Sequence, residues 1–188
     1  MGISKIDPRI LRTRRLLVDS FITVAQLKDF KDITIKDITD KATVNRATFY
    51  AHFVDKYDLL DAVLSENILK NIKEMLSCHD YLSEATIIKI FLAVTKFQRD
   101  LSTQCKKSYE SFSTMIEHKI KKELESVFFS LLIKRNPQRE KEVLKIGAVL
   151  LSWGIYGACV DWQHNSSLPA EEYIKIAMPY FLNGMAVH

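Results

Sequence analysis

Polar and charged side chains crowd one segment, TVNRATFYAHFVDKYDLL at residues 43–60. An arginine there can form a bidentate pair with guanine, and a threonine can contact a base edge or a thymine methyl group. Tyrosine, histidine and lysine can reach phosphate oxygens, which orient a protein on DNA without reading its sequence. Each such residue alone is more often part of a solvated or packed surface. The side chains in question fall within eleven residues and are Arg46, Thr48, Tyr50, His52 and Lys56.

Three helix starts with the same capping pattern surround these residues. Each start has a side chain suited to an N-cap, followed three residues later by another polar residue; the pairs are Thr34 with Asp37, Asn45 with Thr48, and Asp55 with Asp58. The spacing leaves about two turns each for helices at Ile35–Lys41 and Arg46–Phe53. Helices this short need the support of a larger body.

That support is predicted to come from a long amphipathic helix at Pro8–Phe30. Its apolar residues recur at helical spacing, as in Leu17, Phe21 and Val24. With a fourth helix from Asp55 to about Ser77, the pattern predicts a helix-turn-helix embedded in a small bundle. Because Phe49 and Phe53 supply the inward face of the second short helix, its polar residues are expected to face outward and contact DNA.

The run ITIKDITDKATVNRATFYAHFVDKYDLL resembles the DNA-binding signature of the TetR (tetracycline-repressor) family of bacterial regulators. The resemblance covers about Arg9 to Leu64, and TFYAHFVDKYDLL is its most specific part. It implies a recognition helix that begins at Asn45, and a DNA-binding set of Thr34, Lys36, Asn45, Arg46, Ala47, Thr48, Tyr50, His52 and Lys56. Thr43 stands where the family usually has glycine, so the turn between the short helices is expected to differ locally.

The composition favours an all-α fold. The chain has 188 residues, 47% of them hydrophobic, with only five Gly and four Pro. Residues 1–53 hold ten Lys or Arg against six Asp or Glu, which accounts for the whole formal charge of +4. We predict about nine helices in two domains: a helix-turn-helix domain at 1–54, and a helical effector-binding and dimerisation domain at 55–188.

The remaining helices are predicted at Ser83–Gln98, Lys107–Lys134, Pro137–Gln163 and Pro169–Gly184, with Asn136 as a cap before Pro137. The stretch IGAVLLSWGIYGACVDW combines glycines with large apolar residues. Glycine costs about 1 kcal/mol in a helix interior, so close approach by another helix is expected. That partner could lie within the chain, but the resemblance implies a homodimer formed through the last two helices.

The resemblance also implies an unknown small-molecule effector, whose pocket could be lined by Phe112, Met115, His118, Trp153 and Tyr156. No metal site or cofactor is indicated. Three widely spaced cysteines favour reduced thiols in a cytoplasmic protein. The uncharged stretch Ile146–Val160 is shorter than the roughly 20 residues of a membrane helix, so a buried helix and no membrane partner are expected.

Three classes of function remain to be separated. An enzyme has little support, because the five histidines are scattered and no glycine-rich phosphate loop is present. The favoured hypothesis is a ligand-responsive repressor that binds a pseudo-palindromic double-stranded DNA operator as a homodimer. The alternative is a helical protein-interaction adaptor without sequence-specific DNA binding, which would form no discrete, sequence-selective DNA complex.

Overall fold

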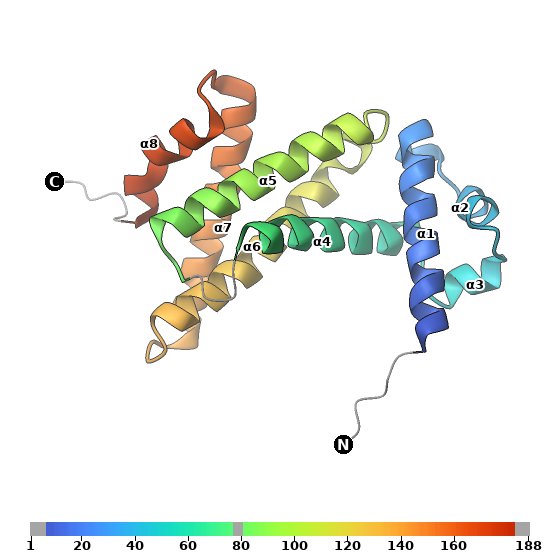
Figure 1. The fold of residues 1–188 in the computed structure, drawn as a ribbon, viewed down its shortest axis with the longest axis horizontal. Coiled ribbons are helices and arrows are strands. Elements are labelled where there is room, and N and C mark those ends of the chain that lie inside the picture. Colours follow the sequence, from blue (N-terminus) through green and yellow to red (C-terminus); the bar gives the residue numbers. More distant parts are fainter. Residues whose placement is uncertain (1–6, 77–80, 183–188) are drawn as a thin grey trace. The chain divides into compact units, whose positions relative to one another are not determined.

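The computed structural model describes residues 7–76 and 81–182, and these contain helices and loops but no strand (Figure 1). The helices are α1 (Pro8–Leu27), η1 (Phe30–Asp32), α2 (Ile35–Ala42), α3 (Arg46–Tyr50), α4 (Lys56–Met75), α5 (Glu84–Gln104), η2 (Glu110–Phe112), α6 (Ser113–Arg135), α7 (Lys141–Asn165) and α8 (Ala170–Leu182), where η denotes a short 3₁₀ helix. The all-α prediction is confirmed, and the eight α-helices of the described residues are close to the nine expected.

The chain packs as two compact units. The first holds the described residues up to Leu64 together with Leu101–Thr114, and the second holds Ser65–Asp100 and the described residues from Met115 onward. Helix α4 therefore begins in the first unit and ends in the second. The predicted domain boundary between residues 54 and 55 does not coincide with a boundary of these packing units. It stays a prediction about function.

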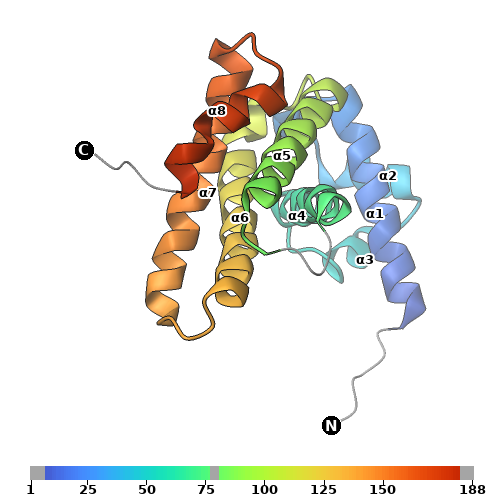
Figure 2. The same cartoon turned by 60° about the vertical axis from the view of Figure 1, so that its left-hand side comes forward.

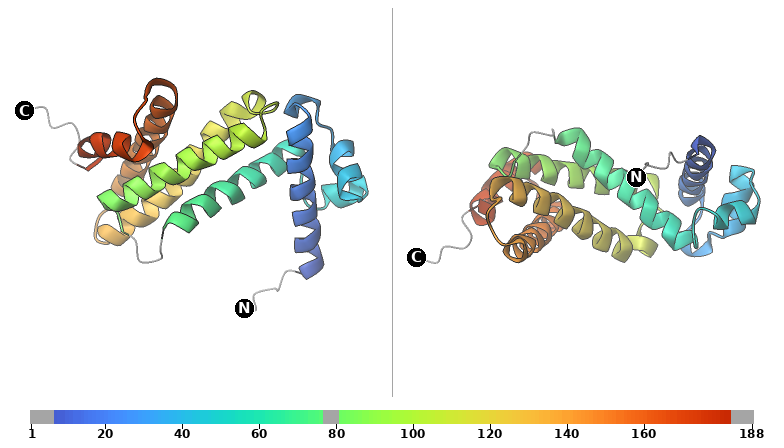
Figure 3. Two further views of the ribbon diagram at one scale, coloured as in Figure 1. Left: turned by 45° about the horizontal axis from the view of Figure 1, so that its top comes forward. Right: turned by 90° about the horizontal axis from the view of Figure 1, so that it is seen from below.

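Phe30 lies at the centre of the first unit. Its ring makes edge-to-face contacts with Phe21 of α1 at 6.1 Å, with Tyr57 of α4 at 5.2 Å and with Phe112 at 5.6 Å between centroids. Aromatic pairs prefer this geometry because the positive ring edge meets the negative face. The amphipathic pattern of α1 thus produces the predicted bundle, in which α2 packs against α1 and α3 packs against α2 (Figure 3).

The segment before α6 contributes to the same unit. The Ser108 hydroxyl, which is fully buried, donates to the carbonyl oxygen of Lys28 at 2.8 Å and lies 3.3 Å from that of Ala25. The Lys107 ammonium donates to Leu27 O at 3.1 Å. These donors satisfy carbonyls at the end of α1, which a helix leaves without intrahelical partners. The predicted helix start at Lys107 is therefore wrong, and α6 begins at Ser113.

The second unit is built around α5. Phe91 of α5 stacks on Tyr173 of α8 at 5.9 Å and meets Trp162 of α7 edge-on at 6.3 Å between ring centroids. The Ser65 hydroxyl of α4 donates to the Glu123 carboxylate of α6 at 3.1 Å. These contacts link α5 to α7 and α8, and α4 to α6. Figure 2 shows α8 lying along α7, against which it packs.

The predicted start of α7 at Pro137 is wrong. Asn136 N–H still donates to Leu132 O at 2.9 Å, and Arg139 N–H donates to Asn136 O at 3.1 Å. Asn136 and Pro137 therefore occupy the first two positions of a tight turn, where asparagine and proline are also favoured. The helix begins four residues later, at Lys141.

Helix α7 is less buried than predicted. Only 28% of its most apolar window is buried, and by length and composition alone it is the one described helix that could cross a membrane. Four of its large apolar residues are at least 45% exposed, and an exposed glycine follows at the same helical spacing. We call this set the α7 stripe; it consists of Val143, Ile146, Leu150, Trp153 and Gly157.

The glycines of α7 serve different purposes. A Cβ added to Gly154 would lie 2.8 Å from Cε1 of Phe181, so this glycine permits close approach of α8 within the chain. A Cβ at Gly157 would meet nothing within 4 Å. Packing within the chain therefore explains Gly154 but leaves Gly157 unexplained.

Two of the three cysteines lie in the described residues. Cys105 and Cys159 are free and buried, and burial raises the pKa of both thiols. Cys78 lies outside the described residues.

Candidate nucleic-acid interface

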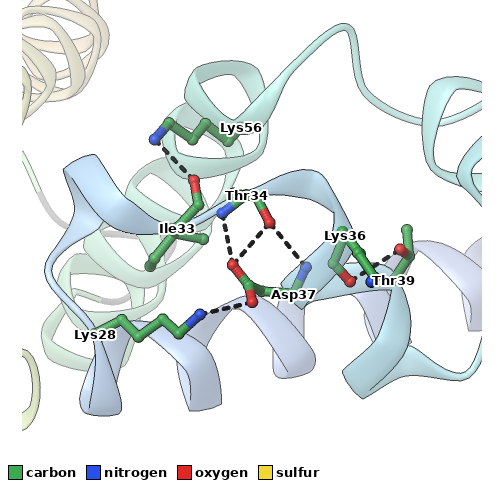
Figure 4. A network of polar contacts seen from close by, with 7 residues as sticks. All are labelled: Lys28, Ile33, Thr34, Lys36, Asp37, Thr39 and Lys56. Carbon is green, nitrogen blue, oxygen red and sulfur yellow. Dashed lines mark hydrogen bonds and ion pairs between the residues drawn. The ribbon is translucent and has the colours of Figure 1, made fainter.

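A capping box fixes the start of α2 (Figure 4). The Asp37 backbone N–H donates to Thr34 Oγ1 at 3.2 Å, and Asp37 Oδ2 accepts from Thr34 N–H at 2.9 Å and from its hydroxyl at 2.8 Å. The Lys28 ammonium donates to Asp37 Oδ1 at 2.6 Å. Because Lys28 and then Thr34 donate to the ionised carboxylate, the pKa of Asp37 falls to about 2. The predicted cap at Thr34 is confirmed, and its hydroxyl is engaged within the protein.

The turn after α2 is a Schellman motif built on Thr43. Thr43 N–H donates to Asp40 O at 3.2 Å, and Val44 N–H donates to Thr39 O at 3.0 Å. The motif needs a left-handed residue, and Thr43 has φ 53° and ψ 40°. The turn therefore keeps the geometry that glycine usually provides, with a β-branched residue held in an unfavourable conformation.

Asn45 is the N-cap of α3. Its Oδ1 accepts from Thr48 N–H at 2.7 Å and from the Thr48 hydroxyl at 2.9 Å, which confirms the predicted N-cap. Helix α3 ends at Tyr50 rather than Phe53, because the N–H groups of both His52 and Phe53 donate to Phe49 O in a closing turn. The side-chain carbonyl of Asn45 and the hydroxyl proton of Thr48 are therefore both used in capping the helix.

The outward face of α3 carries most of the predicted recognition residues. Arg46, Ala47 and Tyr50 are exposed, the last by 57%, whereas Phe49 is fully buried and anchors the helix. Thr48 and His52 are half-buried. Lys36 is exposed on α2. Helices α2 and α3 thus present polar side chains at the edge of the first unit, as the sequence predicts.

Lys56 has partners inside the protein that the sequence did not predict. Its ammonium donates to three backbone carbonyl oxygens, those of Phe30 and Ile33 at 2.8 Å and that of Lys31 at 3.1 Å. The sequence pattern predicted instead that Lys56 reaches a DNA phosphate. In the structure, its ammonium is held by these carbonyls.

Sequence reasoning missed the contribution of α1 to this surface. The Arg14 guanidinium lies over the Phe53 ring, 4.4 Å from its centroid. The amino-terminal half of α1 therefore lies beside the residues that follow α3. Arg12 and Arg15 on the same helix are exposed. The run RTRR at residues 12–15 was the signal that could have identified them.

The five predicted effector residues are divided between the two units. Phe112 is 2% exposed and packs on Phe30 in the core of the first unit. In the second unit, His118 and Trp153 are exposed, and the Lys121 ammonium lies 3.6 Å from the centroid of the Trp153 ring and 5.5 Å from that of Tyr156. Met115 is half-buried. The effector pocket therefore stays a prediction.

Known proteins share the sequence of this interface. The model of the family described as bacterial regulatory proteins, tetR family, matches residues 21–63, which include α2, α3 and the start of α4. The sequence of these residues is therefore similar to the amino-terminal part of TetR-family regulators. The uncharacterized HTH-type transcriptional regulator YxbF of Bacillus subtilis (strain 168) is 42% identical over 64 residues. That stretch is 34% of this chain and only 17% of YxbF.

Solved structures of several regulators share the fold over nearly the whole chain. A TetR transcriptional regulator from Streptococcus agalactiae 2603V is 23% identical with a TM-score of 0.60, over 94% of this chain and 95% of that one. The fatty acid degradation regulator FadR from Bacillus halodurans is 16% identical with a TM-score of 0.56, over 97% and 99%. The repressor AlkX from Dietzia sp. strain DQ12-45-1b, implicated in biodegradation of n-alkanes, is 16% identical with a TM-score of 0.60, over 90% and 95%. The chain thus shares the fold of these solved regulators.

Proposed function

We propose that this protein is a cytoplasmic repressor that binds a pseudo-palindromic operator as a homodimer and releases it when a small molecule binds. The observation that carries the DNA-binding part is the arrangement of α3. This helix is capped by Asn45, anchored by the buried Phe49, and presents Arg46, Ala47 and Tyr50 to solvent. A short helix held this way can enter a major groove.

The side chains divide into reading and gripping roles. Arg46 can pair with a guanine edge, and the methyl groups of Ala47 and Thr48 can contact thymine. The Thr48 hydroxyl donates to Asn45, so its remaining role toward a base is that of an acceptor. Lys36 and Tyr50 are exposed at positions suited to phosphate contacts, which add affinity without sequence preference.

Dimerisation is supported by the α7 stripe. One recognition helix makes too few base contacts for useful specificity, and a two-fold partner doubles them. The stripe repeats at intervals of three and four residues, as expected for a helix that packs on another helix. Helix α8 adds Ile176 and Tyr180, exposed by 66% and 67%. Two copies pairing these helices would bury both faces in a four-helix arrangement.

Close approach at Gly157 fits the same proposal. Its Cα faces open space in the single chain, so a second copy could approach the α7 backbone there. Glycine inside a helix costs about 1 kcal/mol relative to alanine. A dimer contact would give this cost a structural reason that packing within the chain does not provide.

Ligand response is proposed from the connection between the units. Helix α4 is continuous from Lys56 to Met75 and belongs to the first unit at its start and to the second at its end. A ligand among the later helices could therefore act on the DNA-binding part through α4. Two structural neighbours are named for fatty acid degradation and for n-alkane biodegradation, which supports a small, largely apolar effector.

The test of this function is selection of genomic DNA fragments on the protein, followed by footprinting of the enriched fragments. The proposal expects an enriched pseudo-palindrome with half-sites about 34–36 Å apart or a multiple of that distance. Sedimentation should show a dimer at micromolar concentration. An adaptor would retain no selected sequence, and a protein that stays monomeric with and without DNA would contradict the homodimer.

The effector is tested separately. Compounds that raise the thermal midpoint of the free protein are titrated against the operator complex. A coupling free energy of about 1–3 kcal/mol would lower operator affinity roughly 5- to 150-fold. If saturating ligands of the second unit consistently leave operator affinity unchanged, the second unit serves dimerisation and the ligand-responsive part is wrong.

A further inference from the structure

Lys56 lies where the first turn of α4 meets the loop between α1 and α2. Its Nζ lies 2.8 Å from the carbonyl oxygens of Phe30 and Ile33 and 3.1 Å from that of Lys31. The same nitrogen lies 4.7 Å from the centroid of the Phe30 ring and 5.7 Å from that of Tyr57. The ammonium is therefore held by three oxygens and two aromatic rings of the first unit.

This arrangement matches the chemistry of an ammonium group closely. A lysine ammonium has three N–H donors and no acceptor, so three carbonyl partners use its full donor capacity. Charge-assisted hydrogen bonds are stronger than neutral ones, and the aromatic contacts add cation–π attraction. A DNA phosphate could bind this lysine only by displacing one of the three carbonyl oxygens.

The three carbonyls belong to the loop that determines where α2 begins. Phe30 and Lys31 lie in η1, and Ile33, which is 1% exposed, immediately precedes the N-cap Thr34. Lys56 thus connects the start of α4 to the residue next to the capping box, as the Lys56–Ile33 contact in Figure 4 shows. Helix α3 follows α2 directly and packs on it.

We propose that Lys56 is a positioning residue, which sets the orientation of α2 and α3 by holding residues 30–33, and that it does not contact a phosphate. The proposal rests on the proposed function in that the helices it positions are those that bind the operator. It reverses the role that the sequence assigned to Lys56. The phosphate contacts are left to exposed residues such as Lys36.

The experiment compares Lys56→Arg, Lys56→Met and Lys36→Met. Arginine keeps the charge, but its planar guanidinium cannot reproduce three contacts made from one nitrogen. A positioning role therefore predicts that both Lys56 variants lose operator affinity by about tenfold or more. Their affinity for random DNA and the salt dependence of operator binding should stay at the wild-type values. Lys36→Met should lower the salt slope by about 0.9 and weaken both kinds of DNA equally.

Binding is measured well below the thermal midpoint of each variant, so that unfolding does not contribute. If Lys56→Arg binds like the wild type while Lys56→Met loses about 0.9 of the salt slope, Lys56 contacts a phosphate and the proposal is wrong. If both variants melt earlier but keep full operator affinity, Lys56 only stabilises the fold, which also overturns the proposal.

Amide hydrogen exchange in the free protein provides a readout that does not depend on DNA. Both Lys56 variants should increase exchange at Ile33, Ile38 and Phe49, whereas Lys36→Met should leave these amides unchanged. Unchanged exchange in the Lys56 variants would contradict the proposal. If the wild-type protein selects no DNA sequence while these exchange rates respond as expected, the proposed function fails and the positioning contact stands.

Discussion

Replacing Thr43 with glycine is expected to stabilise the protein. Thr43 has φ 53° at the left-handed position of the Schellman motif after α2. A left-handed conformation costs a residue with a Cβ roughly 1–2 kcal/mol. Glycine removes this strain, but it also makes the unfolded chain more flexible. That flexibility offsets about 0.5–1 kcal/mol of the gain in stability. The free energy of unfolding should therefore rise by about 0.5–1 kcal/mol.

The backbone hydrogen bonds of the motif do not depend on the side chain. They run from Thr43 N–H to Asp40 O and from Val44 N–H to Thr39 O, so glycine retains both. Denaturant unfolding measures the change, and a thermal midpoint higher by about 1–4 °C is expected for a chain of this size. Hydrogen exchange at the Val44 amide reports the same change locally and should slow in the glycine variant.

Two further substitutions at this position act as controls. Thr43→Asn should also stabilise, because asparagine tolerates the left-handed region better than other residues with a Cβ. Thr43→Val keeps the β-branch but removes the hydroxyl, which donates to Ala42 O at 2.7 Å. If Thr43→Gly is less stable than the wild type and Thr43→Val loses as much, the hydroxyl contact stabilises the turn and the strain argument is refuted.

The remaining predictions concern recognition, dimerisation and acid stability. Arg46→Ala should cost about 1–3 kcal/mol in operator binding and relax preference at one position per half-site, as measured by binding to a set of operator variants. Gly157→Leu should leave the monomer folded but weaken self-association in sedimentation, whereas Gly154→Ala should disturb the packing of α8 and lower the thermal midpoint. The pKa of Asp37 is depressed to about 2 from an ordinary value of 3.8, so its stabilising effect is present above pH 3.8 and is lost as the pH falls through 2. Asp37→Asn should therefore flatten the fall in stability over this pH range, and an equally steep fall in the variant would contradict the assignment.

Local signals predicted the first unit well because its contacts are close in sequence. The caps at Thr34 and Asn45 each bond a residue three positions later, so spacing alone reveals them. The turn at Thr43 was expected to differ locally, yet Thr43 adopts the left-handed conformation that a Schellman motif requires.

Contacts between distant residues were not predictable in this way. Lys56 bonds carbonyls that lie 23–26 residues earlier in the chain, and Ser108 bonds Lys28, 80 residues earlier. Nothing in local composition indicates either pair. Because backbone carbonyls are present at every residue, the sequence cannot show which of them a lysine or serine will reach.

The second unit shows a different limit. Asn136 and Pro137 fit a helix start and a tight turn equally well, and hydrogen bonds of the folded chain decide between them. Likewise, the apolar residues of α7 are compatible with a buried helix, yet Leu150 is 69% exposed. Composition shows that a helix has an apolar face but does not show whether that face is covered within the chain.

Footprinting of wild-type protein and Arg46→Ala on the most enriched genomic fragment tests the central proposal most directly. The account predicts two protected half-sites related by a pseudo-two-fold axis, with protection by the variant weakened at the base pair that Arg46 reads. If the wild-type protein protects no discrete sequence at moderate salt, or if Arg46→Ala leaves both affinity and sequence preference unchanged, sequence-specific operator binding through α3 is contradicted.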